Sequence, residues 1–280
     1  MTFVSTDWLD AHLGDIDLRV IDASWHLPTT LRKGDAEYRE AHIPGAVFFN
    51  IDVIADTSTG LPHMLPPPDV FASAMGELGL GDGLQFVVYD SVGLFAAARV
   101  WWTLRAYGAE RVAILEGGLP KWTHEGRAIE AGEAHPKAAR FTPRLNRQAL
   151  ADVDSVKAAL TSGSAQIVDA RPNDRFEGRT AEPRAGLKSG HMPGALNLPL
   201  SEVVAHGQLK SKEALAALFA AHGVDLSRPV ITTCGSGVSA AVLGMAVEAA
   251  GGTFAALYDG SWSEWGGRED CPVVTGPAKT

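Results

Sequence analysis

The chain has 280 residues, of which 46% are hydrophobic and 20% are charged, and its formal net charge is -9 at pH 7. Such a composition is typical of a globular protein with a full hydrophobic core. The length suits two ordinary domains. The acidic balance argues against a nucleic-acid or anionic-membrane partner, and no apolar run is long enough to span a bilayer.

The first half of the chain predicts strands that alternate with helices. In order, its features are a strand ending in aspartate, a His-x-Pro-Gly-Ala motif, a second strand before an Ala-rich helix, an acidic-Gly pair and a tryptophan: Val20–Ala23, His42–Ala46, Phe86–Asp90, Glu116–Gly117 and Trp122. The basic, weakly periodic segment 131–147 follows, with Pro136 and Pro143, and we interpret it as a linker. The predicted domains are therefore residues 1–145 and 146–280.

The second half repeats this order of features. Helices are predicted to begin at Asp152 and Ser211 and to end before Gly163 and Gly223. The strand ending in aspartate is Ile167–Ala170, the histidine motif is His191–Ala195 and the second strand is Pro229–Thr233. The Ala-rich helix Ala240–Ala250, the acidic-Gly pair Asp259–Gly260 and the tryptophan Trp265 follow. The chain is thus predicted to be α/β, with two tandem domains that each hold a mostly parallel sheet flanked by helices.

The duplication also allows the two halves to be compared chemically. Aligning them places Asp90 opposite Cys234, and the first half lacks the glycine pair of the second half, since it reads Asp90-Ser91-Val92-Gly93-Leu94. The first domain is therefore predicted to be catalytically silent at this loop. His42 and His191 recur in both halves, which indicates a scaffold role rather than catalysis.

Cys234 lies where a predicted strand ends and a helix begins. Gly235 and Gly237 allow the backbone to curl there, so that successive N–H groups can point at an anion. Together with a helix N-terminus, this environment lowers a thiol pKa and favours a nucleophilic thiolate. The alternative is a small apolar cysteine packed at a strand end, and the glycines favour the reactive site.

These features resemble the two-domain rhodanese-like sulfurtransferases over nearly the whole chain, including aspartate in the silent half and cysteine in the active half. The loop resembles the mercaptopyruvate branch more than the thiosulfate branch, whose members carry basic residues where this chain has Gly235 and Ser236. The family loop usually has threonine at the position of Ser239, which offers the same hydroxyl and N–H. The resemblance implies that Gly235, Gly237, Val238 and Ser239 surround the bound substrate.

The resemblance also implies that Arg175 and Arg184 hold the carboxylate and keto oxygens of a 2-oxo-3-thio acid. A planar guanidinium matches a carboxylate with two parallel hydrogen bonds, which supports this role. The alternative is that both are surface arginines, as we expect Arg32 and Arg99 to be.

In the first half, the resemblance implies that Asp52 and His63 reach the cysteine loop and form a relay with Ser236. A carboxylate that orients an imidazole, which then polarises a hydroxyl, is sound acid–base chemistry. Taken alone, His63 could be a solvated loop residue, and Asp52 a turn or cap residue. The site would then lie in the cleft between the two domains.

The implied reaction moves the sulfur of 3-mercaptopyruvate to Cys234 as a persulfide, and releases pyruvate. A thioredoxin-like protein, a small thiol or cyanide would then accept the sulfur. No metal or organic cofactor is implied, and we expect a monomer. The second cysteine, Cys271, has no assigned role; with so few cysteines and no secretory signal, we expect no disulfide framework and a cytoplasmic location.

Four alternatives remain. The first two are a thiosulfate:cyanide sulfurtransferase and a non-catalytic persulfide carrier or protein-binding module. The third is a dinucleotide-binding enzyme, since Gly235–Ala240 fits G-x-G-x-x-A, but the acidic residue that should bind ribose, Asp259, recurs as Glu116 in the half without the motif. The fourth is a cysteine phosphatase, which would need an arginine where Ala240 stands.

Overall fold

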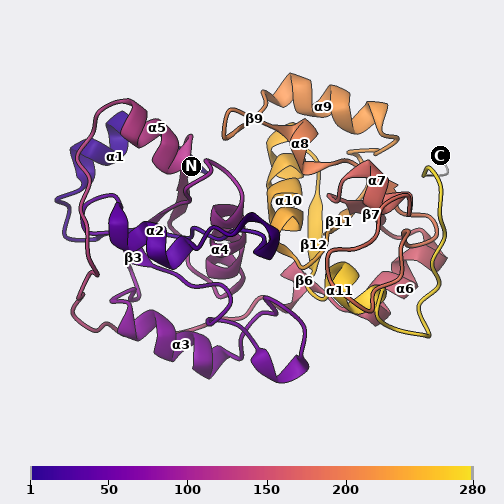
Figure 1. Ribbon diagram of the computed structural model, residues 1–280, viewed down its shortest axis with the longest axis horizontal. Helices are drawn as coiled ribbons and strands as arrows, with labels where there is room; N and C mark the ends of the chain where they lie inside the picture. The colour runs from indigo at the N-terminus through magenta and orange to yellow at the C-terminus, as the bar shows by residue number, and fades with distance from the viewer. Residues whose placement is uncertain (1, 279–280) are drawn as a thin grey trace. The chain divides into compact units, whose positions relative to one another are not determined.

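The computed structural model describes residues 2–278, which form two compact units (Figure 1). The first unit contains the chain up to Asp56, Leu65–Asn146 and His206–Gln208, and the second contains Thr57–Met64, Arg147–Ala205 and the chain from Leu209. The main change of unit therefore falls between Asn146 and Arg147. In addition, residues 57–64 belong to the second unit although the residues before and after them belong to the first, and residues 206–208 belong to the first unit although their neighbours in sequence belong to the second.

The first unit is built on a five-stranded parallel sheet with the order β1-β5-β4-β2-β3. Its strands are β1 (Phe3–Val4), β2 (Leu18–Asp22), β3 (Val47–Phe48), β4 (Gln85–Tyr89) and β5 (Val112–Leu115). Its α-helices are α1 (Thr6–His12), α2 (Gly34–Glu40), α3 (Pro68–Glu77), α4 (Ala96–Ala106) and α5 (Gly118–His124), with a short 3-10 turn, η1 (Pro28–Thr30).

The second unit repeats this sheet with the order β6-β12-β11-β7-β8, again parallel throughout. Its strands are β6 (Leu150–Ala151), β7 (Gln166–Asp169), β8 (Leu196–Asn197), β11 (Val230–Thr233) and β12 (Phe254–Tyr258). Its α-helices are α6 (Val153–Ser162), α7 (Asn173–Phe176), α8 (Leu200–Val203), α9 (Lys212–Ala221), α10 (Val238–Ala250) and α11 (Ser261–Trp265). The 3-10 turns η2 (Thr57–Thr59) and η3 (Arg147–Ala149) and the short strands β9 (Val204–Ala205) and β10 (Gln208–Leu209), which pair with each other, complete the elements.

The predicted fold class, two α/β units with mostly parallel sheets, is confirmed. The predicted helix starts are confirmed too, because Asp152 and Ser211 accept hydrogen bonds from the N–H groups of the first turns of α6 and α9. The helix α10 begins at Val238, two residues earlier than its Ala-rich run suggests, because Gly237 at φ +78° already serves as its N-terminal cap.

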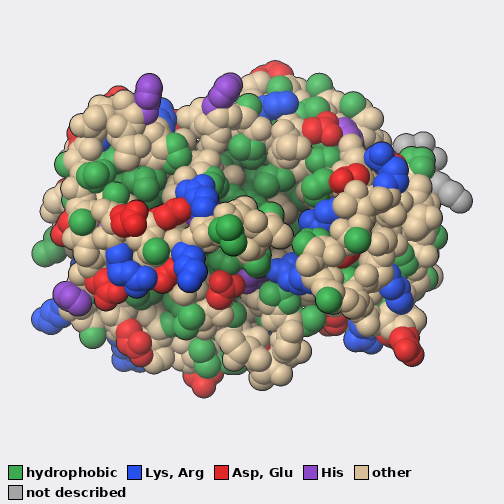
Figure 2. All heavy atoms as spheres, viewed as in Figure 1, with side chains coloured by type: hydrophobic (Ala, Val, Ile, Leu, Met, Phe, Trp, Pro, Cys, Tyr) green, Lys and Arg blue, Asp and Glu red, His purple; other side chains and the backbone are tan. Residues whose placement is uncertain are grey.

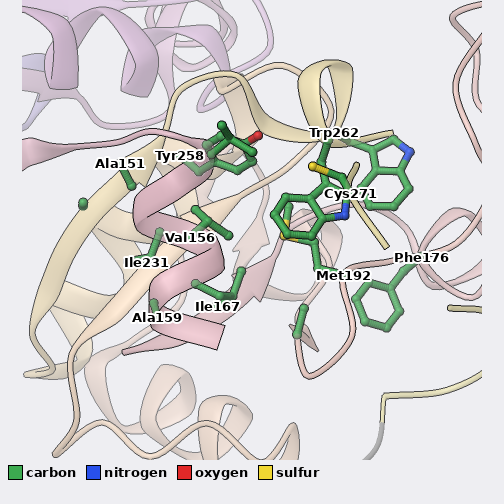
Figure 3. Close-up of a cluster of buried hydrophobic side chains, with 14 residues drawn as sticks. Ala151, Val156, Ala159, Ile167, Phe176, Met192, Ile231, Tyr258, Trp262 and Cys271 are labelled. Atoms are coloured by element: carbon green, nitrogen blue, oxygen red, sulfur yellow. The ribbon is translucent and has the colours of Figure 1, made fainter. Parts of the chain in front are cut away.

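Each unit has its own hydrophobic core. The core of the second unit gathers buried side chains from the sheet, α6, α11 and the C-terminal segment, as Figure 3 shows around Ile167, Ile231 and Tyr258. Cys271 lies in this core near Trp262 and is 1% exposed, and burial raises the pKa of its thiol. Cys271 is therefore a core residue, and both cysteines are free thiols.

The duplicated histidines have matching structural surroundings. The buried ring of His42 stacks on Tyr38 with centroids 4.2 Å apart, and that of His191 stacks on Phe176 at 3.9 Å. In each, Nδ1 lies within hydrogen-bond distance of the backbone oxygen of the residue on which it stacks. This geometry fits the scaffold role predicted for them. The expectation that Arg99 lies on the surface is wrong: it is 2% exposed on α4, with its guanidinium over the Trp102 ring.

The strand order places two loops of the second unit beside each other. From β7 the chain moves outward to β8, and from β11 it moves the other way to β12, although β7 and β11 are neighbours. In open parallel sheets, ligands bind beyond the carboxyl ends of the strands at such a reversal of direction. The loops after β7 and β11 are therefore where a site is expected, and the second one begins with Cys234.

The surface carries charges of both signs, and on the face drawn in Figure 2 the Lys and Arg side chains are interspersed with Asp and Glu. Among the helices of residues 2–278, none combines the length and apolar character needed to cross a membrane.

Candidate active site

Cys234 is the first residue after β11, is 2% exposed, and is held by the start of α11. Its N–H donates to Oγ of Ser261 at 3.3 Å, and its carbonyl accepts from the N–H of Trp262 at 2.9 Å. The next carbonyl, that of Gly235, accepts from both N–H and Oγ of Ser263, at 2.9 and 2.7 Å. The backbone on both sides of the thiol is thus fixed by three consecutive residues of one short helix.

The corresponding loop of the first unit shows what such a curl of backbone can bind. Asp90 follows β4, and its carboxylate accepts hydrogen bonds from the N–H groups of Val92, Phe95 and Ala97 at 3.0, 2.7 and 2.9 Å. Its burial raises the pKa of this carboxyl although these bonds oppose the shift. A carboxyl group bound by backbone N–H groups therefore occupies the position that Cys234 has in the second unit.

Two arginines from the segment after β7, Arg175 in α7 and Arg184 in the loop that follows this helix, face the cysteine loop. A Cβ built on Gly235 would lie 3.5 Å from Nη2 of Arg175 and 3.8 Å from Nη1 of Arg184. Arg184 also donates to Oγ of Ser236 at 3.4 Å. Both guanidinium groups thus lie within van der Waals distance of the space beside Gly235, and together they supply positive charge at the loop that carries the thiol.

A buried ion network fixes one of these arginines. The side chain of Glu182 is 2% exposed and binds Arg175 through both oxygens, while its Oε1 also accepts from Nη1 of Arg171 at 2.7 Å. Arg171 in turn contacts the carboxylate of Asp169, at the end of β7, at 2.8 Å. Its guanidinium lies 4.0 Å from the centroid of the Trp262 ring. The network therefore connects Arg175 to the end of β7 and to the helix that holds Cys234.

His63 lies beside Ser236. The two residues belong to the same unit, because the second unit includes the segment 57–64. The residue is 5% exposed, and its Nδ1 is 3.0 Å from Oγ of Ser236 and 3.4 Å from the Ser236 carbonyl oxygen. His63 has φ +60°, an unusual conformation for a residue other than glycine. Such outliers cluster at functional sites, where the surrounding structure holds them in place.

Asp52 belongs to the first unit, where its Oδ2 accepts from the indole N–H of Trp25 at 3.0 Å. The relay from Asp52 to His63 stays a prediction. The remaining predicted residues lie in the second unit: Gly237 is the N-terminal cap of α10, and Val238 and Ser239 form the first turn of that helix.

Sequence reasoning missed several residues that build this site, namely Asp169, Arg171, Glu182, Ser261, Trp262 and Ser263. A signal was present for two of them, because the repeats differ at these positions. Arg171 stands where the first half has Ser24, and Ser261 stands where it has Gly118. Within residues 2–278, no three His, Cys, Asp or Glu side chains are grouped so that they could hold a metal ion.

Comparison with known protein families gives two matches along the chain. The family model described as "Rhodanese-like domain" matches residues 5–125 and 152–268. The 3-mercaptopyruvate sulfurtransferase of Escherichia coli K12 is 45% identical over 272 residues, which cover 97% of each chain. The human 3-mercaptopyruvate sulfurtransferase is 39% identical, over 94% of this chain and 91% of the human protein.

Solved structures show the same fold. The crystal structure of SseA from Escherichia coli, named among 3-mercaptopyruvate sulfotransferases with the "Rhodanese" fold, matches with a TM-score of 0.87 and 43% identity, covering 94% of this chain and all of that one. The Tum1 protein of Saccharomyces cerevisiae matches with a TM-score of 0.91 and 27% identity, covering 100% of this chain and 99% of that one.

Proposed function

This chain belongs to the rhodanese-like family and is a sulfurtransferase, and we propose that it transfers the sulfur of 3-mercaptopyruvate to a thiol or to cyanide, through a persulfide on Cys234. The observation that carries this proposal is the approach of Arg175 and Arg184 to Gly235, directly after the cysteine. Two guanidinium groups at this distance suit the carboxylate and keto oxygens of a 2-oxo acid whose thiol is directed at Cys234.

In the first step, the Cys234 thiolate attacks the sulfur of 3-mercaptopyruvate. A sulfur–sulfur bond forms, the carbon–sulfur bond breaks, and its electron pair leaves with pyruvate as the enolate. Arg175 and Arg184 stabilise the negative charge that spreads over the enolate oxygen and the carboxylate. Glu182 holds Arg175 in place for this role.

The enolate must then take up a proton to become pyruvate. Ser236 is suited to this transfer, because its hydroxyl lies between Nδ1 of His63 at 3.0 Å and Arg184 at 3.4 Å. Asp52 would orient His63 as the third member of the relay.

The persulfide that remains on Cys234 is anionic near neutral pH. The Asp90 loop of the first unit supports the idea that the loop N–H groups hold this charge, since its N–H groups surround a carboxylate. A thiolate acceptor then attacks the outer sulfur, which restores the Cys234 thiolate. The thioredoxin-like acceptor, the monomeric state and the cytoplasmic location stay predictions.

The test is pyruvate release from 3-mercaptopyruvate with a reducing thiol acceptor, for the wild-type chain and for Cys234→Ser. We expect the variant to lose release by at least about a thousandfold, because a hydroxyl cannot form the persulfide. Cys271→Ala is the matched control: it removes the other thiol, which lies in the core, and should keep the activity of the folded protein.

A parallel assay with thiosulfate and cyanide separates the alternatives. Preference for thiosulfate would contradict the proposed substrate. Activity with neither donor, together with acceptance of a persulfide from another protein, would favour the carrier.

A further inference from the structure

Ser261, the first residue of α11, has a backbone conformation that serine disfavours. Its φ is +49°, in the left-handed region, and its side chain is fully buried. The pair Glu116-Gly117 of the first unit corresponds to Asp259-Gly260 of the second, so Gly118 stands at the position of Ser261. The φ of Gly118 is +54°. The two halves thus share this backbone conformation, but only the first has the residue that adopts it freely.

The serine is not explained by the contact that the two halves share. In both, the N–H that follows this position donates to the carbonyl of the loop residue: Leu119 to Asp90 at 3.1 Å and Trp262 to Cys234 at 2.9 Å. Glycine therefore suffices for the backbone connection between the loop and the helix. What serine adds is a hydroxyl group.

This hydroxyl connects the cysteine to the end of the neighbouring strand. Oγ of Ser261 donates to the carbonyl of Tyr258, the last residue of β12, at 2.8 Å, and accepts from the N–H of Cys234 at 3.3 Å. The half that carries the thiol thus keeps an unfavourable backbone conformation together with a bond to the thiol-bearing residue. Unusual backbone conformations that persist at a site indicate that the residue serves the function of that site.

We propose that Ser261 is a positioning residue for the sulfur transfer: its hydroxyl fixes the peptide plane of Cys234, and so the direction in which Sγ points. This inference rests on the proposed function of Cys234. It predicts that the hydroxyl matters for the reactivity of the thiol more than for the stability of the fold.

Ser261→Gly and Ser261→Ala test this together, because both remove the hydroxyl but only alanine keeps the unfavourable conformation. We expect Ser261→Gly to be more stable than Ser261→Ala, because glycine adopts this backbone conformation freely while both variants lose the same hydrogen bonds. Both should lower kcat for pyruvate release by about tenfold with little change in KM. Both should also move the pH profile for alkylation of Cys234 by iodoacetamide, followed by mass spectrometry over about pH 5 to 10, toward higher pH.

Leu31→Gly is the matched control. Leu31 has φ +59° on an exposed turn of the first unit, so glycine there removes the same kind of unfavourable conformation at a position without a hydroxyl. It should leave kcat and the alkylation profile unchanged.

The proposal is overturned if Ser261→Gly keeps the wild-type kcat and alkylation profile, or if activity follows stability, with only Ser261→Ala impaired. Failure of Ser261→Gly to fold would also overturn it, since glycine is inferred to fit this backbone. Failure of the proposed function would appear in the wild-type chain, as absence of pyruvate release. The shift of the alkylation profile would still decide whether Ser261 positions the thiol.

Discussion

Two aspartates end the equivalent strands β2 and β7, and their surroundings differ. The carboxylate of Asp169 is paired with the buried guanidinium of Arg171. The carboxylate of Asp22 accepts from the N–H of Ser24 at 2.8 Å. A second carboxyl group, that of Asp90, lies near enough to interact with it electrostatically. Burial is the main reason that the pKa of Asp22 is raised to about 6.

The raised pKa predicts how the stability of the chain depends on pH. The folded state binds the Asp22 proton more tightly than the unfolded state, so this contribution is complete below about pH 4 and is lost as the pH rises through about 6. In Asp22→Asn the side chain stays neutral. We therefore expect the free energy of unfolding of the variant, relative to the wild type, to increase by about 2 kcal/mol between pH 4 and pH 7.

Urea unfolding at a series of pH values measures this difference. Asp15→Asn is the control, because Asp15 is exposed and its removal should leave the pH dependence of the wild type nearly unchanged. An equal difference between Asp22→Asn and the wild type at every pH would show that Asp22 does not titrate in this range.

At the scale of elements, the loop between β4 and α4 is organised by one side chain. The N–H groups that bind the carboxylate of Asp90 belong to the loop and to the first turn of α4, whose N-cap residue Phe95 makes no side-chain hydrogen bond to the helix. Asp90 therefore does what a capping residue does, although it stands six residues before the helix begins.

Removal of this carboxylate should destabilise the first unit. Asp90→Ala leaves these N–H groups without their acceptor, and we expect it to lower the free energy of unfolding by about 3 kcal/mol. Asp90→Asn keeps one acceptor oxygen and should lose clearly less. Urea unfolding of both variants checks this order, and an equal loss in both would mean that hydrogen bonding to the loop is not what Asp90 contributes.

Much of the element order could be predicted from the sequence, because capping residues and the repeat are local signals. Asp152, Ser211 and the repeated strands needed no knowledge of packing. The ion network around Arg171 could not be predicted in this way, because it depends on which loops meet at the carboxyl ends of β7 and β11. The same holds for Ser261, whose inferred role depends on its positive φ and on its hydrogen bond with Cys234, which lies 27 residues earlier in the sequence.

At the scale of the whole molecule, the exchange of segments between the units couples their unfolding. Residues 57–64 belong to the second unit but are joined at both ends to the first, and residues 206–208 have the opposite arrangement. Neither unit can keep all its residues in place once the other has lost its structure. We therefore expect the two units to unfold in a single transition.

The chain offers a separate probe for each unit. Five of its seven tryptophans, Trp8, Trp25, Trp101, Trp102 and Trp122, lie in the first unit, so fluorescence reports mainly on that unit. In a Cys234→Ser chain the remaining thiol is Cys271, in the core of the second unit, and its labelling by a thiol reagent reports on that core. Coincident midpoints in urea are expected, and two separated midpoints would contradict the coupling.

The same exchange constrains how the protein can form while it is being made. Many proteins acquire their structure one domain at a time as the growing chain leaves the ribosome. Here the first unit lacks a piece until residues 206–208 have been synthesised, and residues 57–64 must wait for a unit whose strands β11 and β12 come later still. A nascent chain halted just after Asn146 therefore holds an incomplete first unit and an unused segment of the second, which makes such a product a ready substrate for chaperones and proteases.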